Sequence, residues 1–214
     1  ENSMGSFLDA QNLGFQWIEL DVISTKDNEV ICSHNFDLEK ETMGKGYITD
    51  LRYNALKPII AEHNIYFKEQ EILPKVIDVF KMLNSTIKVN IEVKSSHAWD
   101  FRTARALSKI LKKLPASRII ISSFNPFVIL FFKIFHRHIV TGFLFQNIEY
   151  MWFVNWIHPS YIHPRADLVN DDLISYAKAK NLGINVWTVN NDQAIGWCKG
   201  MEVDGIITDL GVIK

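Results

Sequence analysis

The amino-acid sequence predicts an α/β fold of the (β/α)8 TIM-barrel type. Apolar segments of strand length alternate along the chain with longer segments whose apolar residues recur at helical spacing. The strand segments are nearly continuous in apolar residues, which is typical of parallel strands covered on both faces. A doubly wound open sheet is the alternative fold, but no Gly-x-Gly-x-x-Gly turn supports it.

The chain opens on a helix. Residues 4–14 form an amphipathic segment, with Asn2 or Ser3 as its N-cap and Gly14 as its stop. A complete barrel of this type starts with a strand. We therefore expect the first of the eight strands to lie upstream of Glu1.

A strand hairpin and an irregular insertion follow. A buried strand from Trp17 leads through the polar turn 26–28 into a return strand that ends at His34. Residues 36–72 are polar and irregular, and only 51–56 show a short helical pattern. We interpret 36–72 as an insertion into the barrel.

From residue 74 onward, helices and strands alternate. Helices are predicted over 74–83, 99–113, 126–135, 171–180 and 192–199, with a further apolar segment at 150–156. Parallel strands are predicted around Glu19, Glu92, Ile120, Phe143, Ile162, Val186 and Ile206. These seven strands are one short of a closed barrel.

Composition limits the function classes. A length of 214 residues favours one domain over 1–214, and 48% hydrophobic with 22% charged residues is an ordinary globular composition. The net charge of -1 gives no electrostatic support for a nucleic-acid partner. Two cysteines form no disulfide framework, and Cys32, in an apolar strand, suits a reducing compartment such as the cytoplasm. No segment of about eighteen apolar residues predicts a membrane-spanning helix.

The strand from Trp17 carries the first candidate site residues. Glu19 and Asp21 are two apart, so their side chains leave the same face of the strand. Two such carboxylates repel each other unless a cation lies between them or one holds a proton. The hairpin returns His34 to their neighbourhood, so these residues indicate a metal-assisted acid–base site. A solvated Glu-x-Asp face with a structural histidine is the alternative.

Four further residues follow the carboxyl ends of predicted strands, which converge at one mouth of a barrel. They are Glu92, Lys94, Ser123 and Trp187. Three carboxylates favour Mg²⁺ or Ca²⁺, Lys94 could face a phosphate, and Trp187 offers a flat apolar wall. The alternatives are a structural salt bridge for Lys94 and a core position for Trp187.

At this point the chain resembles a known family, the glycerophosphodiester phosphodiesterases, which are (β/α)8 barrels of the phospholipase C-like superfamily. The resemblance rests on eight segments in family order: 1–3, 18–22, 25–27, Ser33-His34 with Leu38 and Thr42, 90–94, 121–126, 186–190 and 204–209. Together they span nearly the whole chain.

The resemblance implies a site and a reaction. Glu19, Asp21 and Glu92 would bind a divalent cation, His34 would be one of two acid–base histidines, and Lys94 and Trp187 would line the substrate pocket. The implied reaction cleaves a glycerophosphodiester to glycerol 3-phosphate and an alcohol. The family's other histidine lies on its first strand, which this chain lacks. Two alternatives stay open: a lysophospholipid phosphodiesterase at a membrane surface, and a non-catalytic barrel that binds phosphorylated ligands.

Two segments are more apolar than the outer helices of a barrel normally are. Residues 127–135 contain one charge, and 150–157 contain none. We expect them to leave an exposed apolar surface that contacts a membrane or a second copy of the chain. Cover by a segment upstream of Glu1 is the alternative.

Overall fold

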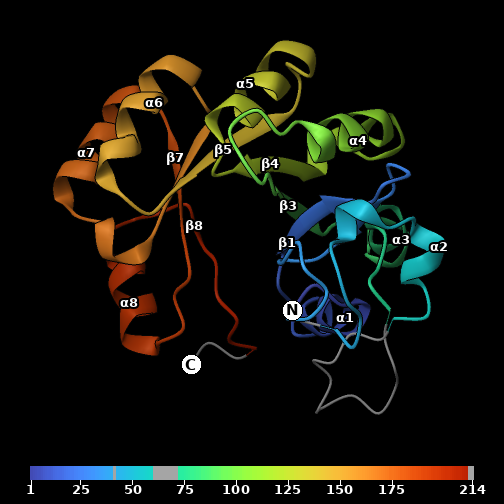
Figure 1. Cartoon of the computed structure of the whole chain (residues 1–214). Helices are drawn as coiled ribbons and strands as arrows, with labels where there is room; N and C mark the ends of the chain where they lie inside the picture. Colours follow the sequence, from blue (N-terminus) through green and yellow to red (C-terminus); the bar gives the residue numbers. More distant parts are fainter. Residues whose placement is uncertain (41, 60–71, 212–214) are drawn as a thin grey trace. The chain divides into compact units, whose positions relative to one another are not determined.

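A computed structural model describes residues 1–40, 42–59 and 72–211 (Figure 1). The chain divides into two compact units, Glu1–Ile119 and Ile120–Lys214. The α/β organisation predicted from the sequence is present in both units, because each combines parallel strands with helices.

The first unit is built around the strand that carries Glu19 and Asp21. Strand β1 (Trp17–Ser24) pairs with β2 (Val30–Cys32) in antiparallel and with β3 (Lys88–Val93) in parallel orientation. The hairpin between β1 and β2 forms where it was predicted. Its short return strand delivers the chain to the segment that contains His34.

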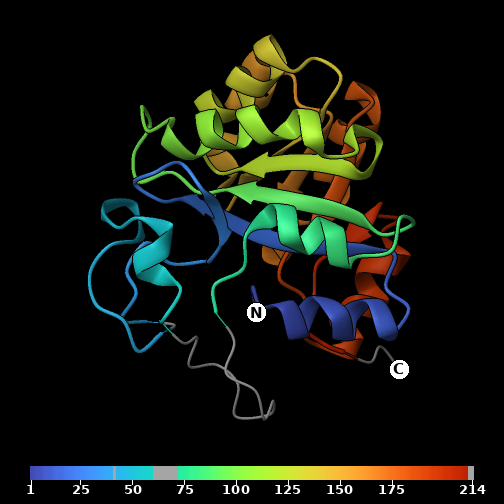
Figure 2. The same ribbon diagram turned by 90° about the vertical axis from the view of Figure 1, so that its right-hand side faces the viewer.

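Helix α1 (Met4–Asn12) precedes this sheet and packs against β1 and α3 (Val76–Met82) (Figure 2). Ser3 is its N-cap: the hydroxyl accepts a hydrogen bond from the Ser6 N–H at 3.2 Å, and Ser6 returns a bond to the Ser3 backbone. Asn2, the other predicted cap, has a φ of 52° and contacts β1 instead.

The insertion after β2 has its own small core. It contains the 3-10 turn η1 (Ile48–Asp50) and helix α2 (Tyr53–Leu56), which agrees with the short helical pattern in the sequence. Residue 41 and residues 60–71 of the predicted insertion lie outside the described residues. The buried residues of this core are Ile23, Ile31, Leu38, Ile48, Tyr53, Leu56 and Leu73.

The second unit is a parallel sheet with helices. Its strands pair in chain order: β4 (Ile119–Ser123), β5 (Val140–Phe145), β6 (Tyr161–Pro164), β7 (Gly183–Val186) and β8 (Gly205–Ile206). Its helices are α5 (Pro126–Phe135), α6 (Met151–Ile157), α7 (Asp171–Lys180) and α8 (Asp192–Gly200). Phe143, Ile162 and Val186 join buried residues of all four helices in one core.

The opposite face of this sheet carries polar side chains in close contact with glycine. The ring of His163 on β6 covers Gly142 on β5, and a Cβ at Gly142 would overlap that ring. His163 is fully buried, and burial lowers its pKa to about 3, so the ring is neutral at ordinary pH. Glycine at position 142 is therefore required by the histidine of the next strand.

All seven predicted parallel strands form, but some element ends differ from the predictions. The helix expected from Pro74 begins at Val76, and the one expected over 99–113 is α4 (Arg102–Ile110) followed by the turn η2 (Leu111–Lys113). The strand predicted around Val186 ends at that residue. Among the described residues, no helix is long and apolar enough to cross a membrane.

Candidate active site

Three carboxylates meet on one face of the first unit. Pairing of β1 with β3 places Asp21 opposite Glu92 and Glu19 opposite Asn90, so all four side chains leave the same face. One carboxylate oxygen from each of Glu19, Asp21 and Glu92 lies within 4.8 Å of the others. The i, i+2 spacing on β1 and the strand register together create this cluster, which could hold a metal ion.

The electrostatics of the cluster favour a cation. Burial raises the pKa of Glu19 well above its ordinary value, and repulsion from Asp21 and Glu92 raises it further. Burial likewise raises the pKa of Glu92, with Asp21 adding to the effect and Lys94 opposing it. A divalent cation would remove this repulsion and restore the charged forms.

Lys94 supplies one compensating charge. Its ammonium lies 2.8 Å from Asp21 Oδ1 and 2.6 Å from Glu92 Oε1. Burial opposes the charge of this ammonium, but the two carboxylates outweigh burial and raise the pKa of Lys94. The salt bridge considered as an alternative for Lys94 is therefore present. One positive charge against three carboxylates still leaves an excess of negative charge for a metal to balance.

Asn2 holds Asp21 through both ends of its side-chain amide. Its Nδ2 donates to Asp21 Oδ2, and its Oδ1 accepts from the Asp21 backbone N–H, each at 2.9 Å. The positive φ of Asn2 points the amide at β1, and asparagine tolerates this conformation better than most residues. Asp21 is thus fixed by Asn2 on one carboxylate oxygen and by Lys94 on the other.

Glu19 and Asn90 carry buried polar atoms without partners. Glu19 Oε1 and both amide atoms of Asn90 make no hydrogen bond among the described residues. Buried groups of this kind are rare in folded proteins and need an explanation. A bound cation and its water would satisfy them, so the residues present fit a metal ion.

His34 lies close to this cluster. The Ser33 N–H donates to the Asp21 backbone carbonyl at 3.1 Å, which ties the segment after β2 to the carboxylate strand. The His34 side chain is exposed, and its charge lowers the pKa of Glu92. The hairpin therefore brings the predicted histidine to the predicted carboxylates.

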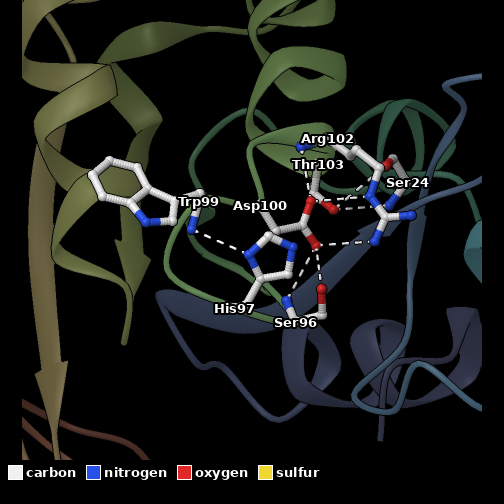
Figure 3. Close-up of polar contacts among 7 residues, drawn as sticks. All are labelled: Ser24, Ser96, His97, Trp99, Asp100, Arg102 and Thr103. Atoms are coloured by element: carbon white, nitrogen blue, oxygen red, sulfur yellow. Dashed lines mark hydrogen bonds and ion pairs between the residues drawn. The ribbon is translucent and has the colours of Figure 1, made fainter.

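A buried aspartate anchors the loop that follows Lys94. Asp100 accepts hydrogen bonds from the Ser96 backbone and hydroxyl and from the backbone and guanidinium of Arg102 (Figure 3). Burial alone would raise the pKa of Asp100, but the bonds from Arg102 and Ser96 hold it well below its usual range. These bonds turn the chain before α4, which explains why that helix begins at Arg102 and not at Trp99.

Asp100→Asn is expected to lower the free energy of unfolding by about 1–3 kcal/mol at pH 7, because charged hydrogen bonds to a buried group are lost. The folded-state pKa is depressed, so the contribution is fully present above pH about 4, decreases progressively below it, and is lost only as the pH falls through the depressed pKa. Urea unfolding of both proteins at pH 7 and pH 3 measures this. Asp78→Asn, which removes an exposed i, i+3 pair with Lys81, is the control. An equal loss of unfolding free energy at pH 7 and pH 3 would mean that the charge of Asp100 does not stabilise the fold.

Ser123 and Trp187 belong to the second unit. Ser123 is buried at the end of β4, and its Oγ accepts from the Asn125 N–H at 3.1 Å. Trp187 follows β7, donates from Nε1 to the His163 carbonyl at 2.7 Å, and meets Phe124 edge to face at 5.2 Å between ring centroids. Trp187 is only partly buried, so one part of its ring remains accessible.

The structure thus brings Glu19, Asp21, Glu92, Lys94 and His34 together in one unit. Three residues beside these side chains were not assigned a role in the site from the sequence: Asn2, Asn90 and Phe124. The motif segments 1–3 and 90–94 contained the first two, and that was the only signal for them. Phe124 lies in the motif segment 121–126, and its contact with Trp187 gives it a place beside the predicted substrate-binding residues.

Comparison with known proteins defines the class. The model of the "Glycerophosphoryl diester phosphodiesterase family" matches residues 1–210. A glycerophosphodiester phosphodiesterase from Caldanaerobacter subterraneus is 30% identical over 216 residues, which cover 98% of this chain and 88% of the relative. The human lysophospholipase D GDPD1 is 31% identical over 101 residues, or 44% of this chain.

Solved structures agree. An Oleispira antarctica phosphodiesterase in complex with sn-glycerol-3-phosphate has a TM-score of 0.85 at 20% identity, covering 98% of this chain and 87% of that protein. The glycerophosphodiester phosphodiesterase from Thermotoga maritima has a TM-score of 0.79 at 25% identity, covering 98% and 88%. These likenesses confirm the predicted α/β barrel class. The chain belongs to the glycerophosphoryl diester phosphodiesterase family.

Proposed function

We propose that this protein is a metal-dependent phosphodiesterase that hydrolyses glycerophosphodiesters to glycerol 3-phosphate and an alcohol. The observation that carries the proposal is the cluster of Glu19, Asp21 and Glu92, with ligand oxygens within 4.8 Å of one another and Lys94 bonded to two of them. Membership of the family supports the reaction class. The Oleispira enzyme, which was solved with sn-glycerol-3-phosphate, supports the product.

Glu19, Asp21 and Glu92 would hold the cation, and their oxygen ligands favour Mg²⁺ or Ca²⁺. When bound, the cation supplies positive charge against the oxygens of the phosphodiester. Lys94 adds a second positive charge beside the same carboxylates and keeps Asp21 and Glu92 in place. Asn2 keeps Asp21 from turning away.

His34 has the chemistry of a proton-transfer group. It is exposed and close enough to Glu92 to affect its pKa, so it can exchange protons with solvent and substrate. We assign it the transfer of one proton, either from the attacking hydroxyl or to the leaving alcohol. In the second unit, Ser123 and Trp187 stay predicted substrate-binding residues.

The test is turnover of glycerophosphocholine by the full-length protein, with glycerol 3-phosphate measured through a coupled dehydrogenase. Product is expected with Mg²⁺ or Ca²⁺ and is expected to disappear with excess chelator. Comparison of the two metals in the same assay identifies the preferred cation. Metal binding without any product would contradict hydrolysis and favour the non-catalytic phosphate-binding alternative.

A lysophospholipid substrate is the second candidate. The similarity of part of the chain to human lysophospholipase D supports it. Turnover of lysophosphatidylcholine and glycerophosphocholine at equal concentration separates the two. Both substrates release choline from the same kind of phosphodiester, so their rates of choline release can be compared directly. The cytoplasmic location stays a prediction, which the free and buried state of both cysteines supports.

Asn2→Ala is expected to weaken divalent-cation binding roughly 10- to 100-fold, the usual cost of losing a group that orients a metal ligand. Calorimetric titration with Mg²⁺ and Ca²⁺ measures the affinity. Asn28→Ala is the control, because Asn28 also has a positive φ, of 64°, but lies in the exposed turn after β1. Equal affinities in the two variants would mean that the Asn2 amide does not orient a metal ligand.

A further inference from the structure

Helices α5 and α6 carry apolar side chains on two faces. On α5, Val128, Ile129 and Phe132 are buried in the second unit. On α6, Val154 and Ile157 are buried in the same core, and Leu130, Met151 and Phe153 pack against it. The other apolar residues of the two helices are exposed or partly exposed and define an aromatic face: Phe127, Phe131, Ile134, Phe135, Trp152 and Trp156.

Helical spacing and ring contacts make this face continuous. Phe127, Phe131 and Phe135 are four residues apart, so they form one stripe along α5. The stripe meets α6 where Phe127 contacts Trp156 edge to face at 5.6 Å between centroids. Both helices are drawn in Figure 1. The two helices therefore present one surface.

Much of this surface is open to solvent. Phe135 is 67% exposed, Trp152 is 60% exposed and Ile134 is 51% exposed. Single exposed apolar residues are ordinary, but a continuous aromatic patch indicates a binding surface. Tryptophan in particular favours the boundary between water and lipid, where the ring meets acyl chains and the indole N–H meets polar groups.

Basic residues accompany the aromatic face along the chain. Lys133 lies on α5, and Arg137 and His138 follow its last turn. From residue 126 to residue 158, Glu149 is the only acidic residue. No ion pair among the described residues neutralises Lys133 or Arg137. Anionic headgroups would supply the missing negative charge.

We propose that α5 and α6 dock this protein on an anionic phospholipid surface, with Trp152 and Trp156 in the interfacial layer and Lys133 and Arg137 against headgroup phosphates. The helices have 10 and 7 residues, far short of a membrane span, so they lie on the surface. A second copy of the chain fits less well. A two-fold interface would bring one basic-rimmed face against another, with only Glu149 as an acidic complement.

The test is co-sedimentation of the full-length protein with phosphatidylcholine vesicles that contain or lack phosphatidylglycerol. The wild type is expected to bind the anionic vesicles more tightly. The double variant Trp152→Glu/Trp156→Glu is expected to lower the partition coefficient by at least ~10-fold, because two interfacial anchors are replaced by charges. Trp197→Glu is the matched control, because Trp197 on α8 is 46% exposed, as is Trp156.

A second pair of variants separates charge from aromatic burial. Lys133→Glu/Arg137→Glu is expected to remove the preference for anionic vesicles, whereas Lys199→Glu on α8 is expected to keep it. A wild type that stays in the supernatant with both vesicles, or variants that bind as the wild type does, would overturn the proposal. Self-association that is lost in the Trp variants without vesicle binding would assign the face to a second copy. Turnover of water-soluble glycerophosphocholine should be unchanged throughout, so failure here is distinct from failure of the proposed hydrolysis.

Discussion

Glu92→Gln is expected to reduce the affinity for Mg²⁺ and Ca²⁺ by roughly 100-fold or more and to remove most turnover with it. A buried carboxylate is replaced by an uncharged amide, so the cation loses one of three charged ligands. The loss should exceed that of Asn2→Ala, because Glu92 would contact the metal and Asn2 would act through Asp21. Calorimetric titration gives the affinity directly.

The same variant should retain its fold without metal. Glutamine is nearly isosteric with glutamate, and its Oε1 can still accept a hydrogen bond from Lys94. It also removes a carboxylate that repels Glu19 and Asp21. Thermal unfolding is therefore expected to show a metal-dependent rise in Tm for the wild type that the variant lacks. Glu29→Gln, at an ion pair with Lys75 in the same unit, is the control. Metal binding by Glu92→Gln that equals the wild type would remove Glu92 from the site.

The arrangement of elements was predictable because hydrophobic periodicity reports burial directly. Helices 126–135 and 171–180 form at the predicted residues, and a strand forms around Phe143 as predicted. The predicted ends of helices and strands are wrong where a long-range or side-chain contact determines the residue at which the element begins or ends. Asp100 accepts hydrogen bonds from Ser96 before it and Arg102 after it, so α4 begins at Arg102. No local apolar pattern reveals such a contact.

The candidate site was predictable to the extent that it depends on alternation along strands. Glu19 and Asp21 share a face by spacing alone, and the parallel register then sets Asp21 opposite Glu92. Asn2 was missed because its contact with Asp21 spans 19 residues and depends on a positive φ. Asn90 was missed because a buried amide acquires meaning only when its neighbours and its lack of partners are known.

His34→Ala is expected to lower kcat by roughly 10²–10⁴, the contribution of a positioned proton-transfer group. Stability should change little, because the side chain is exposed and carries none of the core. His138→Ala, at another exposed histidine, is the control for turnover of glycerophosphocholine. Unaltered turnover in His34→Ala, or loss of the folded state, would return His34 to a structural role.

The leaving group then shows which proton His34 moves. From a glycerophosphodiester of p-nitrophenol, the nitrophenolate leaves without being protonated. From glycerophosphocholine, the choline oxygen must be protonated as it leaves. If His34 protonates the leaving alcohol, the defect of His34→Ala is expected to shrink strongly with the nitrophenyl substrate. If His34 deprotonates the attacking hydroxyl, both substrates are expected to show the same defect. Metal affinity measured on the same variant should match the wild type, because His34 is not among the three ligands of the cluster. A loss of metal binding in His34→Ala would mean that the defect arises in the carboxylate cluster and not in proton transfer.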